Sequence, residues 1–399
     1  MQHKQYAEVI NRIKQSRKPF NRYMTGVLFL TWGVIGAGFF ALPQAMLRVG
    51  IIPSIIIMTL VGILVVIMHL LLAEVSLSLP GHATIVGMGR QLFPRWLARM
   101  SAAVSIGNFF LGILIYVVVS WAFIQTLVGS FGLAINHVRA TTIYVVVIAA
   151  STLWGFKSST RIDKVIVSTL LGVFLMIALY ALGRGDMIPQ TSQLMPLSPR
   201  MLYSICLLSF LGVSAVPLLN HITKHRPEQT ASIITSSGML VTVTAILFSL
   251  AIISLSGNGT TDDVARGLLH THGPILGAIA SITGLCAILS SHIPVMNHLT
   301  EIFVGDGHTT RIRARRALIA LPFLIYLYFD PSFITLLGVV GGLLSGLMAM
   351  LVCLMNIRLH TTKQKLHIIR VLPNDQMRSR IVFVVCGVGV LYHILTIIF

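Results

Sequence analysis

Acidic residues are scarce in this chain. Only 11 of its 399 residues are Asp or Glu, and charged residues together make up 10% of the sequence, against about 25% in soluble domains. Hydrophobic residues account for 55%, and the mean hydropathy is +0.88. A chain with so few charges cannot cover a soluble surface of this size, so the composition predicts a membrane protein.

Cysteine is rare too, and short catalytic motifs are missing. No HExxH, GxSxG or carboxylate pair occurs within an apolar segment, so we expect a protein that is not an enzyme. Loops of at most about 20 residues leave no room for the soluble output domain of a membrane sensor. The four cysteines lack CxxC spacing and predict buried residues, with no metal site, disulfide or cofactor: Cys206, Cys286, Cys353 and Cys386.

Basic residues are abundant by contrast, and they exceed the acids by 18. In a soluble protein this excess would suggest nucleic-acid binding. Here the basic residues lie between apolar segments, where they report orientation in a membrane. We therefore expect the lipid bilayer, and no nucleic acid, as the partner of these charges.

Eleven apolar segments follow a polar, basic tail over residues 1–22. Each approaches the length of about 20 residues that a helix needs to cross a bilayer. No convincing cleavage site follows the basic start, so we expect the first segment to remain in the mature protein. A polar stretch at 78–99 predicts a short surface helix. The segments lie at about 23–49, 51–77, 100–131, 141–155, 165–183, 201–220, 232–256, 273–303, 315–329, 332–357 and 381–398.

The loop charges predict which side each loop occupies. With the N-terminus in the cytoplasm, all but five of the 29 basic residues fall on the cytoplasmic side, as the positive-inside rule requires. The C-terminus then ends outside. The five basic residues left outside are Arg48, Arg139, Arg184, Arg200 and Arg266.

Two matching motifs interrupt the first and sixth apolar segments. Gly38 to Pro43 reads Gly-Phe-Phe-Ala-Leu-Pro, and Gly212 to Pro217 reads Gly-Val-Ser-Ala-Val-Pro. A helical proline removes the hydrogen bond to the carbonyl four residues earlier, here Phe39 and Val213. One such motif could be a packing kink, but two matched copies predict broken helices at a transporter's central site.

The repeat predicts two inverted halves. Helices one to five would span 23–183 and helices six to ten 184–357, with the eleventh helix and its preceding loop at 358–399. Because five is odd, the second half enters the membrane from the opposite side, and the two breaks meet near the midplane. Exposed amide ends suit a carboxylate and carbonyl ends suit an ammonium group, which a free amino acid combines.

Candidate substrate contacts lie at the two breaks and on the third segment. On the third segment, Asn108 and Tyr116 are eight residues apart and predict a shared face, although a packed core tyrosine fits the pattern equally. A Cβ at Gly36 or Gly38 would block close approach of a ligand to the exposed backbone. The contacts expected at the breaks are Ile35, Gly36, Ala37 and Gly38 in the first and Phe210, Leu211, Gly212 and Ser214 in the second.

Candidate coupling residues lie mainly in the eighth segment. Ser290 and Ser291 could supply oxygen ligands to an ion or bond back to their own helix, and only one of them can face the first helix squarely. His292 could carry a proton or sit as a hydrogen-bonded core histidine. Glu74 and Glu301 lie near helix ends, where salt bridges are more common than proton carriage.

The motif at residues 33–43 resembles the first-helix signature of the hydroxy and aromatic amino-acid permeases, and residues 209–217 are similar to their sixth-helix signature. These permeases form an amino acid/auxin permease-like branch of the amino acid–polyamine–organocation superfamily. Leu211 interrupts the Ser-Phe-Gly pattern, and Asn297 stands where an acid is often found.

The resemblance implies an all-α membrane protein with eleven transmembrane helices in the five-plus-five inverted repeat, the LeuT-type fold. It also implies proton-driven import of an aromatic or hydroxy amino acid across the cytoplasmic (inner) membrane. Sodium-coupled symport and amino-acid exchange remain alternatives, because two serines in the eighth segment could hold half of a sodium site.

Single-cysteine variants in a cysteine-free background test the predicted orientation. A membrane-impermeant thiol reagent applied to intact cells should label the loop that contains Asp262, because that loop lies outside. It should not label positions in the 305–313 loop, and labelling there from outside would contradict the orientation.

Overall fold

The computed structural model describes residues 19–79, 84–153, 160–184, 196–223, 226–305, 309–361, 371 and 375–398, and within these ranges every regular element is a helix. The tail at 1–18 and most of the loop at 362–374 lie outside the described residues. The elements are α2 (Pro19–Val34), α3 (Gly38–Val49), α4 (Ile51–Ser78), α5 (Ile85–Leu92), α6 (Arg95–Gly129), α7 (His137–Leu153), α8 (Thr160–Arg184), α9 (Pro199–Phe210), α10 (Ala215–Ile222), α11 (Pro227–Ser256), η1 (Gly257–Gly259), α12 (Ala265–His272), α13 (Pro274–Gly305), α14 (Arg311–Phe329), α15 (Phe333–Val339), η2 (Val340–Ser345), α16 (Gly346–Thr361) and α17 (Asp375–Ile398).

All eleven predicted segments are helical, but not all pass a test of length and hydropathy. Seven stretches of the described residues do so, and an eighth is the bent pair α2 and α3. The helices α7 and α8 contain shorter apolar stretches, and α14 begins with four arginines in six residues. Eleven crossings therefore stay a prediction. The polar stretch at 78–99 holds α5, packed on α6.

The first break lies upstream of the proline that predicted it. The axes of α2 and α3 differ by 67°, and the interruption falls at Ile35, Gly36 and Ala37. Pro43 lies inside α3, which continues past it. The interruption thus falls at three of the four residues expected at the first break, and it lies before the Phe39 carbonyl that Pro43 would free. The amides of Phe39 and Phe40 instead bond to the carbonyls of Gly36 and Ala37, at 3.1 and 3.2 Å, and start the new helix.

The second break spans residues 211–214, between α9 and α10. Pro217 is the third residue of α10. Amides in the first turn of a helix have no intrahelical acceptor, so proline there costs no hydrogen bond and fits the start of the new helix. Pro217 thus marks where the second half-helix begins, whereas Pro43 lies inside the corresponding half-helix α3.

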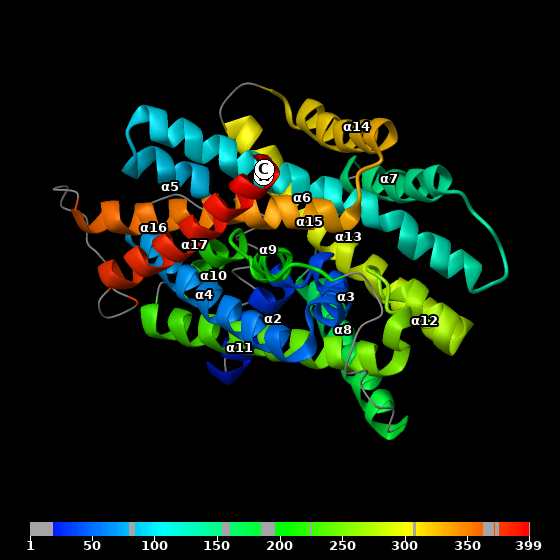
Figure 1. The fold of residues 1–399 in the computed structure, drawn as a ribbon. Coiled ribbons are helices and arrows are strands. Elements are labelled where there is room, and N and C mark those ends of the chain that lie inside the picture. Colours follow the sequence, from blue (N-terminus) through cyan, green and yellow to red (C-terminus); the bar gives the residue numbers. More distant parts are fainter. Residues whose placement is uncertain are drawn as a thin grey trace.

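The two breaks lie against each other because small residues meet there. A Cβ built on Gly33 would be 2.7 Å from the Cβ of Ala215, and one on Gly212 would be 2.6 Å from Val34 Cγ2. Correspondingly, α2 packs on α10 and α3 packs on α9. Neighbouring helices enclose the pair: α4 packs on α11 below the breaks as drawn, and α6 packs on α13, α7 and α14 above them (Figure 1).

A buried cluster of phenylalanines anchors α3 beside the first break. Phe39 and Phe40 contact Phe174 of α8 and Phe248 of α11, and Phe40 also meets Phe123 of α6 edge-on, with ring centroids 5.2 Å apart. These rings are 0–3% exposed. The half-helix after the break is thereby fixed to three other helices.

A π-helical turn interrupts the tenth apolar segment at Val340–Ser345. It packs on α9, and a Cβ on Gly341 would collide with the backbone carbonyl oxygen of Ser204. Glycine is therefore required for the approach of these two backbones.

We expect Gly341→Ala to destabilise the protein by about 1–3 kcal/mol, because a methyl group placed against a backbone oxygen forces the helices apart. Gly172→Ala on α8 is the matched control. No atom lies within 4 Å of the new Cβ there, and alanine is the better helix former by about 1 kcal/mol. Thermal unfolding in detergent should show a lower midpoint for the first variant only; equal midpoints would contradict this packing.

Candidate substrate and coupling site

A hydroxyl of α13 holds the first break. Ser291 Oγ donates a hydrogen bond to the carbonyl oxygen of Ile35 at 3.2 Å. This carbonyl lies in the interrupted segment, where the helical ladder has no donor for it. The bond joins two segments that are 256 residues apart in sequence.

Tyr116 adds a second hydroxyl group beside Gly36. A Cβ on Gly36 would be 3.3 Å from Ser291 Oγ and 3.5 Å from Tyr116 Oη, so all three converge on one point. Gly36, Tyr116 and Ser291, predicted from widely separated segments, are therefore brought together.

His292 extends this cluster toward α7. Its Nδ1 lies 2.8 Å from the hydroxyl of Tyr144, and its ring lies between those of Tyr116 and Tyr144, with centroids 5.6 and 5.7 Å away. The ring is 2% exposed, and its Nε2 has no hydrogen-bond partner. We refer to Tyr116, Tyr144, Ser291 and His292 as the polar cluster. Its unpaired ring nitrogen can bind a ligand oxygen or a proton.

Ser290 points away from the first break. Its hydroxyl donates to the carbonyl of Ala287, 2.9 Å away on its own helix. Adjacent helical residues point about 100° apart, which is why only one serine reaches Ile35. Of the two predicted hydroxyl ligands, only Ser291 lies at the break.

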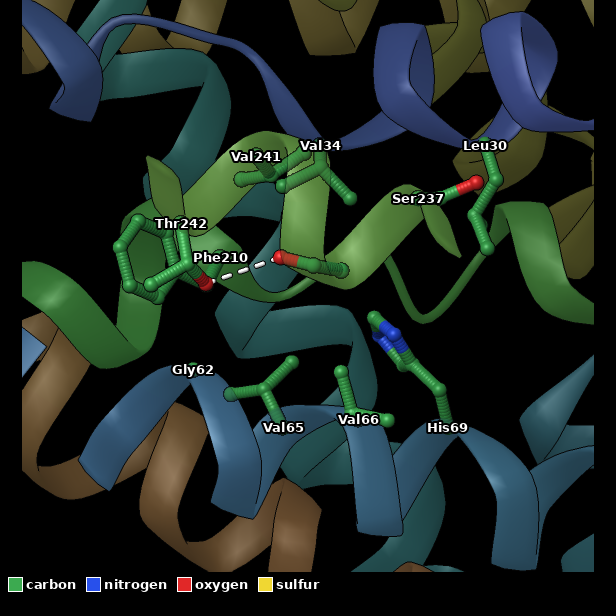
Figure 2. A pocket seen from close by; sticks show the side chains of 11 residues that line it. Leu30, Val34, Gly62, Val65, Val66, His69, Phe210, Ser237, Val241 and Thr242 are labelled. Atoms are coloured by element: carbon green, nitrogen blue, oxygen red, sulfur yellow. Dashed lines mark hydrogen bonds between the residues drawn. The ribbon is translucent and has the colours of Figure 1, made fainter. Parts of the chain in front are cut away.

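The second break is held by a residue that the sequence did not single out as a site residue. The amide of Gly212 donates to Nε2 of His69 at 3.2 Å, and the imidazole is 3% exposed. Figure 2 shows the His69 ring rising from α4 into a cavity between α2, α4, α9 and α11. Phe210 and Val34 line this cavity, which has room for about one water molecule.

Two predicted glycine contacts are used for packing between helices. A Cβ on Gly38 would collide with the side chain of Ser209 on α9, and Gly212 faces Val34. The missing side chain at Gly38 is therefore required by the neighbouring helix itself. Ala37 is buried, whereas Leu211 and Ser214 are partly exposed within the second break.

Asn108 and Tyr116 do not share their contacts. Asn108 Nδ2 donates to the Ser345 hydroxyl at 3.0 Å, which links α6 to the π-helical turn. Tyr116 instead faces Gly36 and Ser291. Eight helical residues leave about 80° between two side chains, enough to direct them to different neighbours.

The two glutamates are both paired near helix ends, as predicted. Glu74 Oε1 lies 2.6 Å from His360 Nε2, and its Oε2 accepts from the amide of Val371. Glu301 is 3.1 Å from a guanidinium nitrogen of Arg311. Neither belongs to the polar cluster at the breaks.

Arg266 joins α12 to α6. Its guanidinium is 2.6 Å from Asp263 and lies over the ring of Trp121, 5.1 Å from the centroid. The salt bridge to Asp263 orients the guanidinium, and the cation–π contact with Trp121 joins α12 to α6. Among the described residues, no group of three or more His, Cys, Asp or Glu side chains could hold a metal ion.

The fold is also found in solved transporter structures. MhsT in complex with L-phenylalanine matches with a TM-score of 0.68 and 15% identity, covering 93% of this chain and 98% of that one. Mhp1, a nucleobase-cation-symport-1 family transporter with bromovinylhydantoin bound, matches with a TM-score of 0.62 and 13% identity, covering 94% and 91%. Both likenesses concern the fold, which is the LeuT-type fold predicted from the two broken helices.

Sequence comparison identifies the family directly. No curated protein sequence matched the chain. The profile of the tryptophan/tyrosine permease family matches residues 20–393, nearly the whole chain. The matched range therefore includes both breaks and every helix that contributes to the polar cluster. The chain is a multi-pass membrane transporter that belongs to the tryptophan/tyrosine permease family.

Proposed function

We propose that this protein imports an aromatic or hydroxy amino acid across the cytoplasmic membrane by proton-coupled symport with alternating access. The observation that carries the proposal is the convergence of the first break with Tyr116, Ser291 and His292 in a buried site. Such a site offers exposed backbone groups and neutral hydroxyls but no fixed charge, which suits a zwitterion better than an ion of one sign. The N-terminus is proposed to be cytoplasmic and the C-terminus outside.

In this proposal the first break binds the amino and carboxylate groups. The amides of Phe39 and Phe40 are already bonded within the new helix, so the carboxylate would bind the amides of the interrupted segment before them, and Tyr116 Oη can donate to the same group. Phe210 lines the cavity at His69, and in this proposal its ring forms the wall of the substrate site on that side.

Sodium coupling is the second candidate, and one observation favours it. Ser291 Oγ and the Ile35 carbonyl provide two neighbouring oxygens at the break. A hard cation takes about six oxygen ligands, however, and Ser290 is turned away onto Ala287. Proton coupling therefore has the stronger support.

We expect Gly36→Val to weaken substrate binding at least about tenfold, because its methyl groups would occupy the space between Ser291 and Tyr116. Binding of radiolabelled tryptophan, tyrosine, serine and threonine to detergent-purified protein is the measurement. Gly112→Ala on α6, where no atom lies within 4 Å of the new Cβ, is the control. Unchanged affinity in a monodisperse Gly36→Val sample would remove the first break from the binding site.

Proteoliposomes test the driving ion. With sodium replaced by choline, an inward proton gradient should accumulate the substrate above its equilibrium level, and dissipating the gradient should abolish the accumulation. Counterflow without accumulation would identify an exchanger. Loss of all transport without sodium, together with no response to a pH gradient, would contradict proton coupling. It would favour sodium coupling, with the oxygens of Ser291 and Ile35 as candidate ligands.

A further inference from the structure

The hydrogen bond between Gly212 and His69 is unusual because its acceptor can be titrated. Gly212 N–H belongs to the interrupted segment between α9 and α10, and His69 Nε2 accepts it at 3.2 Å. Since Nε2 accepts, the ring is neutral and carries its hydrogen on Nδ1. A buried amide without an acceptor is costly in hydrocarbon, so the second break depends on this imidazole.

Protonation would reverse the role of Nε2. Both nitrogens of an imidazolium are donors, and a backbone amide can only donate, so N–H would then face N–H across 3.2 Å. The contact cannot persist, and the break must move away from α4 or rearrange. His292 differs in this respect, because the Tyr144 hydroxyl opposite its Nδ1 can rotate and exchange donor for acceptor.

His69 is the ionisable side chain among the residues that line its cavity. Ten further residues line its cavity, and none of them is ionisable. Other titratable groups on the packed elements lie elsewhere: Tyr23 of α2 bonds Ser236, and Glu74 of α4 pairs with His360 of α16. On α9, Arg200 lies over the ring of Tyr392 and Tyr203 lies against Gly389, and Glu228 lies in the first turn of α11. On α9 the thiol of Cys206 is fully buried one turn before Phe210.

The cavity beside the imidazole has space for a water. The cavity has room for about one water molecule, and its two hydroxyls already donate to backbone carbonyls: Ser237 to Val27 and Thr242 to Gly238. Both hydroxyl oxygens keep lone pairs that can accept from a water (Figure 2). A water held there by the two hydroxyls would be the immediate proton donor to the ring.

We propose that His69 is the proton-binding residue whose protonation releases the amide of Gly212 and so links the driving ion to movement of the second break. This inference rests on the proposed proton-coupled symport and names its coupling residue. Hydronium from the outer aqueous phase gives its proton to the Nε2 lone pair and leaves as water. Release of the same proton to the cytoplasm restores the neutral ring and its bond to Gly212.

His69→Gln is the direct test, since a glutamine side-chain oxygen can still accept from Gly212 N–H but is not protonated at these pH values. In proteoliposomes we expect this variant to retain counterflow within about threefold of wild type but to lose accumulation under a proton gradient. Substrate affinity of wild type should fall as pH rises, by up to about tenfold per unit for one linked proton, and that slope should vanish in the variant.

His298→Gln is the matched control. His298 is another histidine within an apolar helix, but its Nε2 has no hydrogen-bond partner and its ring lies on α13 against Phe109. It should accumulate substrate as wild type does. If His69→Gln also accumulates normally while wild type responds to the gradient, the inference is wrong and proton symport stands. If wild type itself ignores the gradient, proton symport fails, and the inference with it.

Hydrogen–deuterium exchange decides the case in which His69→Gln does not fold. In wild-type protein, a peptide containing Gly212 should lose protection as pH is lowered, after correction for the intrinsic exchange rate, because its amide loses the acceptor. A peptide from the middle of α13 should keep its protection. Equal protection of the Gly212 peptide across the pH range would overturn the proposal.

Discussion

The structure depends on one constraint: backbone groups freed within a membrane need partners inside the protein. Two helices are interrupted, and each interruption is satisfied by a side chain from a different helix. Ser291 of α13 donates to the carbonyl of Ile35, and His69 of α4 accepts from the amide of Gly212. The two breaks therefore require opposite partners, a donor for one and an acceptor for the other, and this asymmetry gives them different chemistry.

Close packing of the breaks joins these two chemistries mechanically. Gly33 faces Ala215 and Gly212 faces Val34, so neither interrupted segment can shift far without displacing the other. Beyond the first break, Phe39 and Phe40 are fixed to three further helices through a buried aromatic cluster. The half-helix α3 is thus the anchored part. Movement is left to α2 and to the segment around Gly212, where the titratable contact lies.

The architecture could be predicted from sequence because its signals are local. Apolar length and two matched Gly-to-Pro motifs located both broken helices, and the pairing of Glu74 and Glu301 followed from their places near helix ends. The exact residues of the breaks could not be read from the prolines, since Pro217 fits the first turn of α10. His69 and Tyr144 were missed because their partners lie 143 and 148 residues away, where no periodic pattern connects them.

The π-helical turn at Val340–Ser345 has a consequence for the opposite end of its helix. A π turn accommodates one extra residue, and each residue of an α-helix advances the side-chain direction by about 100°. All of α16 is therefore rotated relative to α15 by that amount. His360 lies on the rotated side, so its alignment with the buried carboxylate of Glu74 depends on an insertion some fifteen residues earlier. Loss of a single residue between Val340 and Ser345 would restore a continuous α-helix and turn this imidazole away from its partner.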